Sequence, residues 1–170
     1  MEQAIARAQE LDWSLWDVPT GSRLYSYSPA AVPGAFAALA NVGDETESRN
    51  AYNNLMNALG HNHSGTPYPA MVPGSQLLAA LAPLLDGWAL AAALEVLTDC
   101  FLWTRGEGEF RDSLGGAHHL AEDTAENIRP LLGWLRRLST VTAGNPPSRA
   151  LTELLLALEE DRAAAGEVER

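Results

Sequence analysis

The segment VPGAFAALA at Val32–Ala40 is followed, 40 residues further on, by VPGSQLLAA at Val72–Ala80. In both places the triplet Val-Pro-Gly opens a segment rich in Ala and Leu, and a second apolar segment follows each of them. The helices predicted from these four segments are Ala35–Ala40, Thr46–Leu59, Ser75–Leu85 and Ala89–Trp103. A period of about 40 residues with two helices per unit indicates stacked helical repeats.

A third unit is predicted closer to the C-terminus, with helices from Ile128 to Leu138 and from Ser148 to Ala164. The second helix of each unit carries an apolar stripe at helical spacing. These stripes are Ala51, Leu55, Ala58 and Leu59, then Leu90, Leu94, Leu97 and Phe101, then Leu151, Leu154, Leu155 and Leu158. Because β-branched residues are few and never alternate, no strands are expected. The predicted fold is all-α, a short HEAT-like α-solenoid (α-α superhelix) of about three helical hairpins.

We expect a single domain over residues 1–170, with five parts. They are an N-terminal cap at 1–28, repeat 1 at 29–60, repeat 2 at 71–103, a loop insertion at 104–122 and repeat 3 at 123–165. The insertion is rich in Gly and charged residues, so we do not expect it to belong to a packed helix. In the cap, Trp13 and Trp16 are three residues apart, and one helical turn would place both on a single face.

The composition limits the classes of function that need to be considered. With 170 residues, of which 46% are hydrophobic and 19% charged, the chain is long enough for a full core. Eleven basic against 22 acidic residues give a net charge of −11, which argues against binding to nucleic acid or to an acidic membrane surface. One Cys allows no intramolecular disulfide. Because neither a signal peptide nor a membrane-spanning segment is recognisable, we expect a cytoplasmic protein.

Several short motifs resemble those of a known family. They are Leu11-Asp12-Trp13-Ser14, Val32-Pro33, Leu59-Gly60-His61, Gly65-Thr66-Pro67-Tyr68-Pro69-Ala70 and Val72-Pro73. Together they resemble bacterial HEAT-repeat-like proteins that are common in actinobacteria, over roughly residues 11–103. The resemblance implies an α-solenoid in which the Gly-Thr-x-Tyr-x-Ala turn joins one repeat to the next. Some members of that family resemble immunity proteins of polymorphic toxin systems.

The residues that most often carry chemistry give no catalytic or metal site here. The pairs His61/His63 and His118/His119 show no recognised ligand spacing, so we expect ordinary loop residues and no bound metal. Cys100 lies in an apolar helical segment, where its thiolate is disfavoured and the thiol inert. The Gly-x-Ser-x-Gly, P-loop and dinucleotide-binding motifs are all missing. We therefore expect no enzyme activity and no cofactor.

The candidate partner-binding residues lie on the polar faces of the second helices, which usually line the concave side of a HEAT-like stack. They are Asn50, Asn54 and Asn57 on the first, Glu95 and Asp99 on the second, and Glu153 on the third. In the insertion, Glu109 and Phe110 form a further candidate contact, because an aromatic residue among charges is a common anchor for a protein partner. The alternatives are a solvated face without a partner and a loop without a binding role.

The function predicted from these observations is that of a non-catalytic protein-binding module. Its most concrete form is an immunity protein whose acidic face binds and neutralises a basic toxin, because complementary charge speeds association and favours the right partner. A HEAT-like scaffold or regulatory adaptor in a bacterial pathway is the alternative. A HEAT-like enzyme acting on DNA bases needs a basic groove, which the net charge of −11 argues against.

Overall fold

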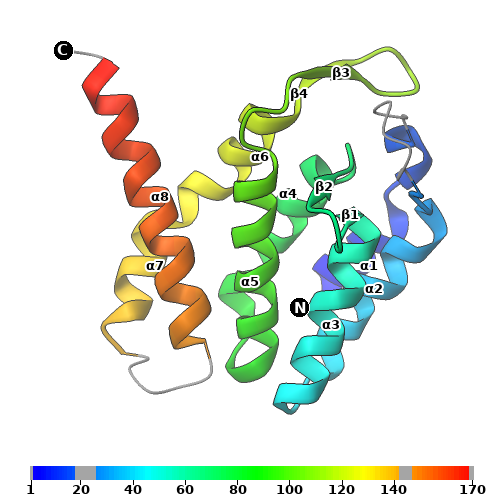
Figure 1. Ribbon diagram of the computed structural model, residues 1–170. Coiled ribbons are helices and arrows are strands. Elements are labelled where there is room, and N and C mark those ends of the chain that lie inside the picture. The colour runs from blue at the N-terminus through cyan, green and yellow to red at the C-terminus, as the bar shows by residue number, and fades with distance from the viewer. Residues whose placement is uncertain (1, 18–25, 142–146, 169–170) are drawn as a thin grey trace.

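The computed structural model describes residues 2–17, 26–141 and 147–168, and this part of the chain is predominantly helical, as predicted (Figure 1). The α-helices are α1 (Glu2–Glu10), α2 (Val32–Ala38), α3 (Glu45–Leu59), α4 (Met71–Leu81), α5 (Gly87–Trp103), α6 (Leu120–Ile128), α7 (Leu132–Ser139) and α8 (Ser148–Val168). Short 3-10 helices are η1 (Trp13–Trp16), η2 (Pro29–Ala31), η3 (Leu39–Asn41), η4 (Ala82–Leu84) and η5 (Arg129–Leu131). The strands are β1 (Gly60–His61), β2 (Thr66–Pro67), β3 (Glu109–Arg111) and β4 (Ala117–His119).

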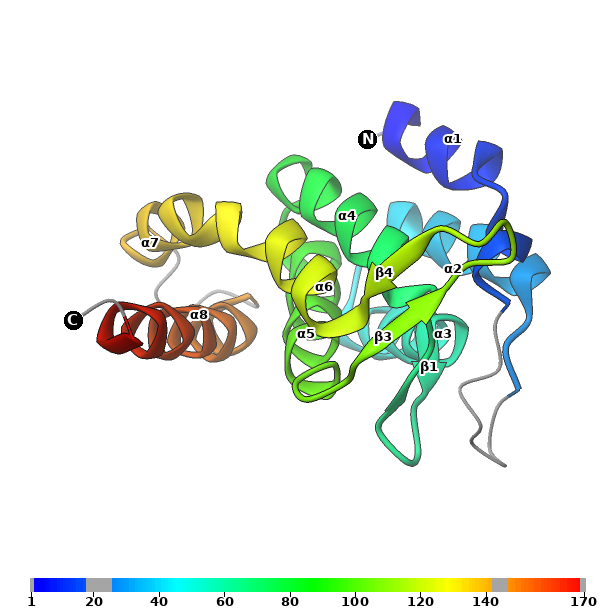
Figure 2. The same cartoon turned by 90° about the horizontal axis from the view of Figure 1, so that it is seen from above.

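The helices form two layers. The long helices α3, α5 and α8 lie side by side, with α5 in the middle and in contact with both of the others. Seen from above, α4, α6 and α7 lie behind this row, α2 lies behind α3, and α1 packs further back against α2 and α4 (Figure 2). Helices α3, α5 and α8 correspond to the second helices of the three predicted units, and they share one face of the molecule.

The ends of α3 show why the chain becomes helical where it does. Asp44 is the N-cap of α3, and its Oδ1 accepts a hydrogen bond of 2.8 Å from the backbone N–H of Glu47. Glu45 and Glu47 place negative charge in the first turn, at the positive end of the helix dipole. The helix ends at Leu59, where Gly60 takes up extended backbone and begins β1.

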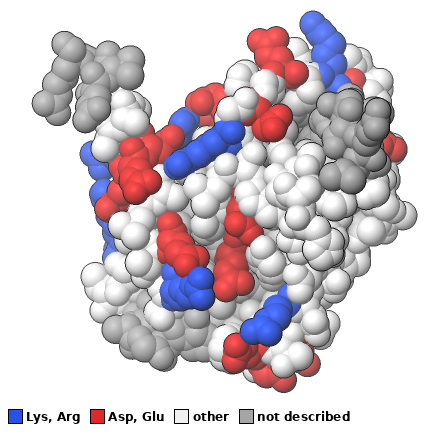
Figure 3. Space-filling view, viewed as in Figure 1, with Lys and Arg blue, Asp and Glu red and all other residues white. Residues whose placement is uncertain are grey.

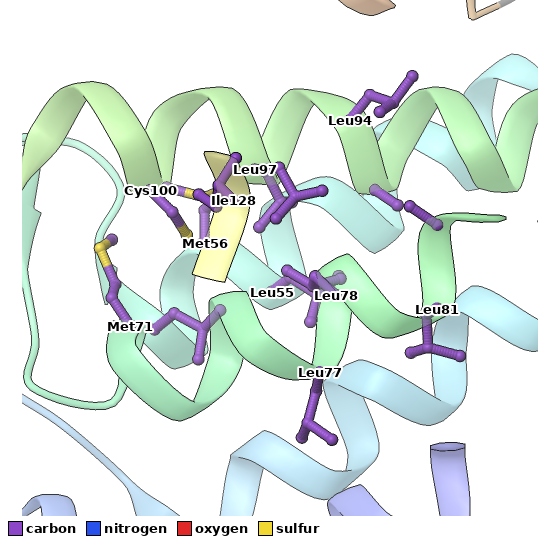
Figure 4. Close-up of a cluster of buried hydrophobic side chains, with 14 of the residues drawn as sticks. Leu55, Met56, Met71, Leu77, Leu78, Leu81, Leu94, Leu97, Cys100 and Ile128 are labelled. Atoms are coloured by element: carbon purple, nitrogen blue, oxygen red, sulfur yellow. The ribbon is translucent and has the colours of Figure 1, made fainter. Parts of the chain in front are cut away.

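The hydrophobic core lies between the two layers (Figure 4). Its fully buried side chains include Leu55, Met56, Met71, Leu78, Leu81, Leu94, Leu97, Cys100 and Ile128, drawn from α3, α4, α5 and α6. The predicted stripe Leu90, Leu94, Leu97 and Phe101 is buried along α5. Since α5 also contacts α4 and α6, it is covered on most sides, and this explains its nearly continuous apolar sequence. Burial raises the pKa of the Cys100 thiol, consistent with an inert core residue.

Segment 104–122 differs from the unstructured insertion that we expected. It contains the antiparallel hairpin β3–β4, with Phe110 opposite His118, and its last three residues already belong to α6. Asp112 fixes the turn, because its Oδ1 accepts hydrogen bonds from the backbone N–H groups of Leu114 (2.9 Å) and Gly116 (2.8 Å). Gly115 takes the left-handed conformation at φ +87°, which favours glycine.

Two further differences concern strands and the third unit. The turn after α3 closes through a second small hairpin, in which Gly60 pairs with Pro67 and His61 with Thr66. The helix predicted over Ile128–Leu138 is divided, since α6 ends at Ile128, η5 follows, and α7 begins at Leu132. Pro130 lies in η5, where its missing N–H donor prevents a regular α-helical hydrogen bond.

Candidate functional site

The face formed by α3, α5 and α8 carries a pocket of about 240 Å³, which we call the acidic pocket. It is lined by Tyr52 of α3, Glu95, Thr98 and Asp99 of α5, and Arg149 and Glu153 of α8. Figure 3 shows this region as acidic side chains grouped around one basic side chain in the middle of the face. The structure thus brings together three of the predicted partner-binding residues, Glu95, Asp99 and Glu153.

Helical spacing and helix packing place these side chains. Glu95 and Asp99 are one turn apart on α5, and Arg149 and Glu153 are one turn apart on α8, so each pair projects from one face of its helix. The opposite faces of both helices are apolar and buried, with Leu94 and Leu97 on α5 and Leu151, Leu154 and Leu158 on α8 toward the core. Packing of α5 against α8 then sets the two polar faces beside each other.

Two hydrogen bonds organise the acidic pocket. The Tyr52 hydroxyl donates to Asp99 Oδ2 at 2.5 Å, which joins α3 to α5 across 47 residues of sequence. Arg149 Nε donates to Glu153 Oε1 at 3.0 Å, an exposed ion pair within α8. One guanidinium thus stands against three carboxylates, and the pocket keeps an excess of negative charge.

The pocket perturbs the titration of its acids. Partial burial raises the pKa of Glu95, and the guanidinium of Arg149 opposes this shift while Glu153 and Asp99 add to it. Burial likewise raises the pKa of Asp99, against the effect of the hydrogen bond from Tyr52. Burial and the neighbouring Asp99 also raise the pKa of Tyr52, so its hydroxyl stays a donor at neutral pH. The charged carboxylates are therefore held in surroundings that stabilise them poorly.

This arrangement suits recognition of a cation. Carboxylate oxygens accept charge-assisted hydrogen bonds from guanidinium and ammonium groups, and such bonds are stronger in partly desolvated sites. Tyr52 was not predicted from the sequence, and only its position in a second helix points to it. Arg149 was not predicted either, although its spacing of four residues from Glu153 signals an ion pair on the same face.

The three asparagines do not line the acidic pocket, contrary to expectation. Asn50 and Asn54 line a separate pocket of about 240 Å³, beside Asn41 and Glu47 at the junction of η3 and α3. Asn57 is exposed on the same helix. Each helical residue turns by about 100°, so these positions lie roughly on the opposite side of α3 from Tyr52. It is Tyr52, and not an asparagine, that α3 turns toward α5.

Phe110 and Glu109 also lie outside the acidic pocket. Phe110 is half-buried in the hairpin, stacked on His118 at 5.1 Å between ring centroids and tilted against Trp16 at 6.1 Å. Glu109 is exposed beside it. Trp13 packs elsewhere, stacked on Phe36 at 5.9 Å, so the two tryptophans have different partners. Phe110 thus attaches the β3–β4 hairpin to η1.

The histidines have individual structural contacts. The ring of His118 lies between two carboxylates, with Nε2 at 3.2 Å from Asp112 Oδ2 and Nδ1 at 3.3 Å from Asp123 Oδ2. His119 is the N-cap of α6, where its Nδ1 accepts from the N–H of Glu122. The Nδ1 of His61 lies 2.9 Å from the hydroxyl of Ser64. Across the described residues no three His, Cys, Asp or Glu side chains form a group that would hold a metal ion.

Comparison of the chain with family models, with curated proteins and with solved structures finds no match in any of the three. Among the helices of the described ranges, none combines the length and the apolar composition needed to cross a lipid bilayer. The geometry of the acidic pocket is accordingly the main basis for a functional proposal.

Proposed function

We propose that the chain is a short HEAT-like α-solenoid that acts in the cytoplasm as a non-catalytic protein-binding module, and that its acidic pocket binds a basic protein. In the most concrete form it is an immunity protein that neutralises a toxin by covering or distorting the toxin's active site. Inhibition of this kind needs binding alone and no chemistry from the chain.

The observation that carries the proposal is the convergence of Glu95, Asp99 and Glu153 from two helices on one pocket with a single arginine. Burial raises the pKa of Glu95 and of Asp99, so their charges cost folding stability. Functional sites often contain residues that lower the stability of the fold, because binding or activity requires them. A basic side chain from a partner would relieve this cost and turn it into affinity and specificity.

The test is a binding titration with the basic proteins encoded beside this chain's reading frame, each expressed in an inactive form. The proposal predicts a one-to-one complex, and it predicts that co-expression of the chain restores growth to cells that express the active partner. Reversing the charge of the pocket with Glu95→Lys and Asp99→Lys is expected to weaken the complex about 100-fold. Glu95→Gln with Asp99→Asn removes the same two negative charges with side chains of nearly the same shape. It tests the pocket even if the charge-reversed variant fails to fold.

The matched control is Glu107→Lys with Glu126→Lys, which changes the net charge equally at exposed positions outside the pocket. This control should bind within about threefold of the native chain, because distant exposed charges are screened at physiological salt. If both pairs weaken binding equally, the overall charge and not the pocket is responsible. If several unrelated, harmless proteins bind instead, the chain is a scaffold or adaptor.

A further inference from the structure

Two exposed leucines extend the acidic pocket along the same helix faces. Leu102 of α5 is 40% exposed and Leu156 of α8 is 54% exposed, although most large apolar side chains of the described chain are buried. Leu102 follows Asp99 by three residues, and Leu156 follows Glu153 by three residues. At 3.6 residues per turn, each leucine lies on the same face as the carboxylate one turn before it.

The two leucines also lie at the same level of the molecule. Helices α5 and α8 run in the same direction side by side (Figure 1). The acidic pocket pairs Glu95 and Asp99 with Arg149 and Glu153. Beyond the pocket, the side chain of Arg105, just past the end of α5, donates to the carbonyl of Ala157, one turn after Glu153 on α8, at 3.3 Å. The polar faces are thus in register, and the leucines occupy the next turn of both helices.

We infer that this surface, the acidic pocket together with Leu102 and Leu156, binds a cationic amphipathic helix of a partner protein; the inference rests on the function proposed above. The matching segment carries two basic residues one turn apart and an apolar residue on the following turn. Along α5, the distance from Glu95 to Leu102 is about 10 Å at 1.5 Å of rise per residue, which is the spacing of positions i and i+7 on the incoming helix.

The chemistry favours this occupant over a purely basic one. A basic segment alone would meet three carboxylates but would leave both leucines in water. An apolar side chain placed on Leu102 and Leu156 removes apolar area from water, and burying one leucine-sized side chain is worth about 1.5–3 kcal/mol, or roughly 10-fold to 100-fold in affinity. An apolar contact beside charge pairs is also the usual composition of the centre of a protein interface.

The experiment uses the purified chain and two fluorescein-labelled synthetic helical peptides. One peptide carries arginines at positions i and i+4 and leucine at i+7, and in its twin serine replaces that leucine. Fluorescence anisotropy at about 0.15 M salt limits non-specific attraction between opposite charges. The leucine peptide is expected to bind at least about 10-fold more tightly than its twin.

Variants of the chain locate the effect. Leu102→Ser with Leu156→Ser should abolish the preference for the leucine peptide, whereas Leu84→Ser, at a leucine that is 57% exposed on η4, should preserve it. The inference is overturned if the twins bind the native chain equally, if neither binds, or if the double-serine variant retains the preference. Equal binding of the twins that still requires Glu95 and Asp99 would reject this inference and leave the proposed function standing.

Discussion

Alanine at Gly74 is expected to destabilise the protein, whereas alanine at Gly34, the equivalent position of the first Val-Pro-Gly triplet, is expected to stabilise it. A Cβ atom added at Gly74 would lie 2.6 and 2.8 Å from the two methyl carbons of Leu59, a residue with no solvent exposure. A Cβ at Gly34 meets nothing within 4 Å. The same substitution therefore tests whether α4 approaches α3 as closely as described.

The magnitudes follow from two opposing effects. Alanine inside a helix gains about 0.5–1 kcal/mol over glycine, and this gain applies to both positions. At Gly74 the overpacked core costs about 1–3 kcal/mol, and subtracting the helix gain leaves a net loss of about 1 kcal/mol at the middle of these ranges. The free energies of unfolding of the two variants should differ by roughly 2 kcal/mol, which corresponds to roughly 4–8 °C in Tm for a chain of this size.

Chemical and thermal denaturation, followed by circular dichroism, measure the difference directly. A double-mutant cycle with Leu59→Ala adds a second check, because alanine at Gly74 should cost less stability when the Leu59 methyl groups are absent. Equal stabilisation by both glycine replacements, or no coupling to Leu59, would show that α3 and α4 are not in close contact at this point.

Three further predictions concern the acidic pocket and the core. The folded state raises the pKa of Glu95, so the folded protein binds a proton at this carboxylate more tightly than the unfolded chain does. Glu95→Gln should therefore increase the free energy of unfolding at pH 7, by about 0.5 kcal/mol after solvent screening. Urea titrations should show that this gain vanishes as the pH falls below about 4, where the carboxyl group is protonated in both states. Tyr52→Phe removes the donor to Asp99 and should cost about 1 kcal/mol at pH 7 but clearly less at pH 3, where the acid is neutral; an equal loss at both values would contradict the role of that bond. Cys100 should react with a thiol reagent such as DTNB only at the rate of unfolding, and rapid labelling of the native chain would show that the thiol is accessible.

The long helices and the acids of the pocket were predictable because their signals are local. The apolar stripe Leu90, Leu94, Leu97 and Phe101 repeats at helical spacing, and it is buried as expected. Glu95 and Asp99 follow from the same periodicity, since they occupy the face that the stripe leaves over. That Glu153 joins them depends on α8 lying beside α5, which the repeat pattern also indicated.

The contacts that were missed depend on distance in space or on very short elements. The hydrogen bond between Tyr52 and Asp99 spans 47 residues, and no local pattern announces it. The asparagines were misplaced because the sequence defines the polar side of α3 but not its rotation relative to α5. The strands hold two or three residues each, which is too few for an alternating pattern to be visible in the sequence. The turn between β3 and β4 is set instead by the side chain of Asp112 and the left-handed backbone of Gly115.

The central position of α5 has a consequence for the order in which the protein folds during synthesis. Its neighbours α3 and α4 precede it in the chain, but α8, which covers its other flank, comes only after α6 and α7. Domains begin to fold as the chain leaves the ribosome, N-terminal part first, so one side of α5 stays uncovered until Ser148 and the residues after it emerge. A chain truncated before α8 would therefore leave one side of the apolar helix α5 exposed. Such a chain is expected to aggregate or to be bound by chaperones and degraded by proteases.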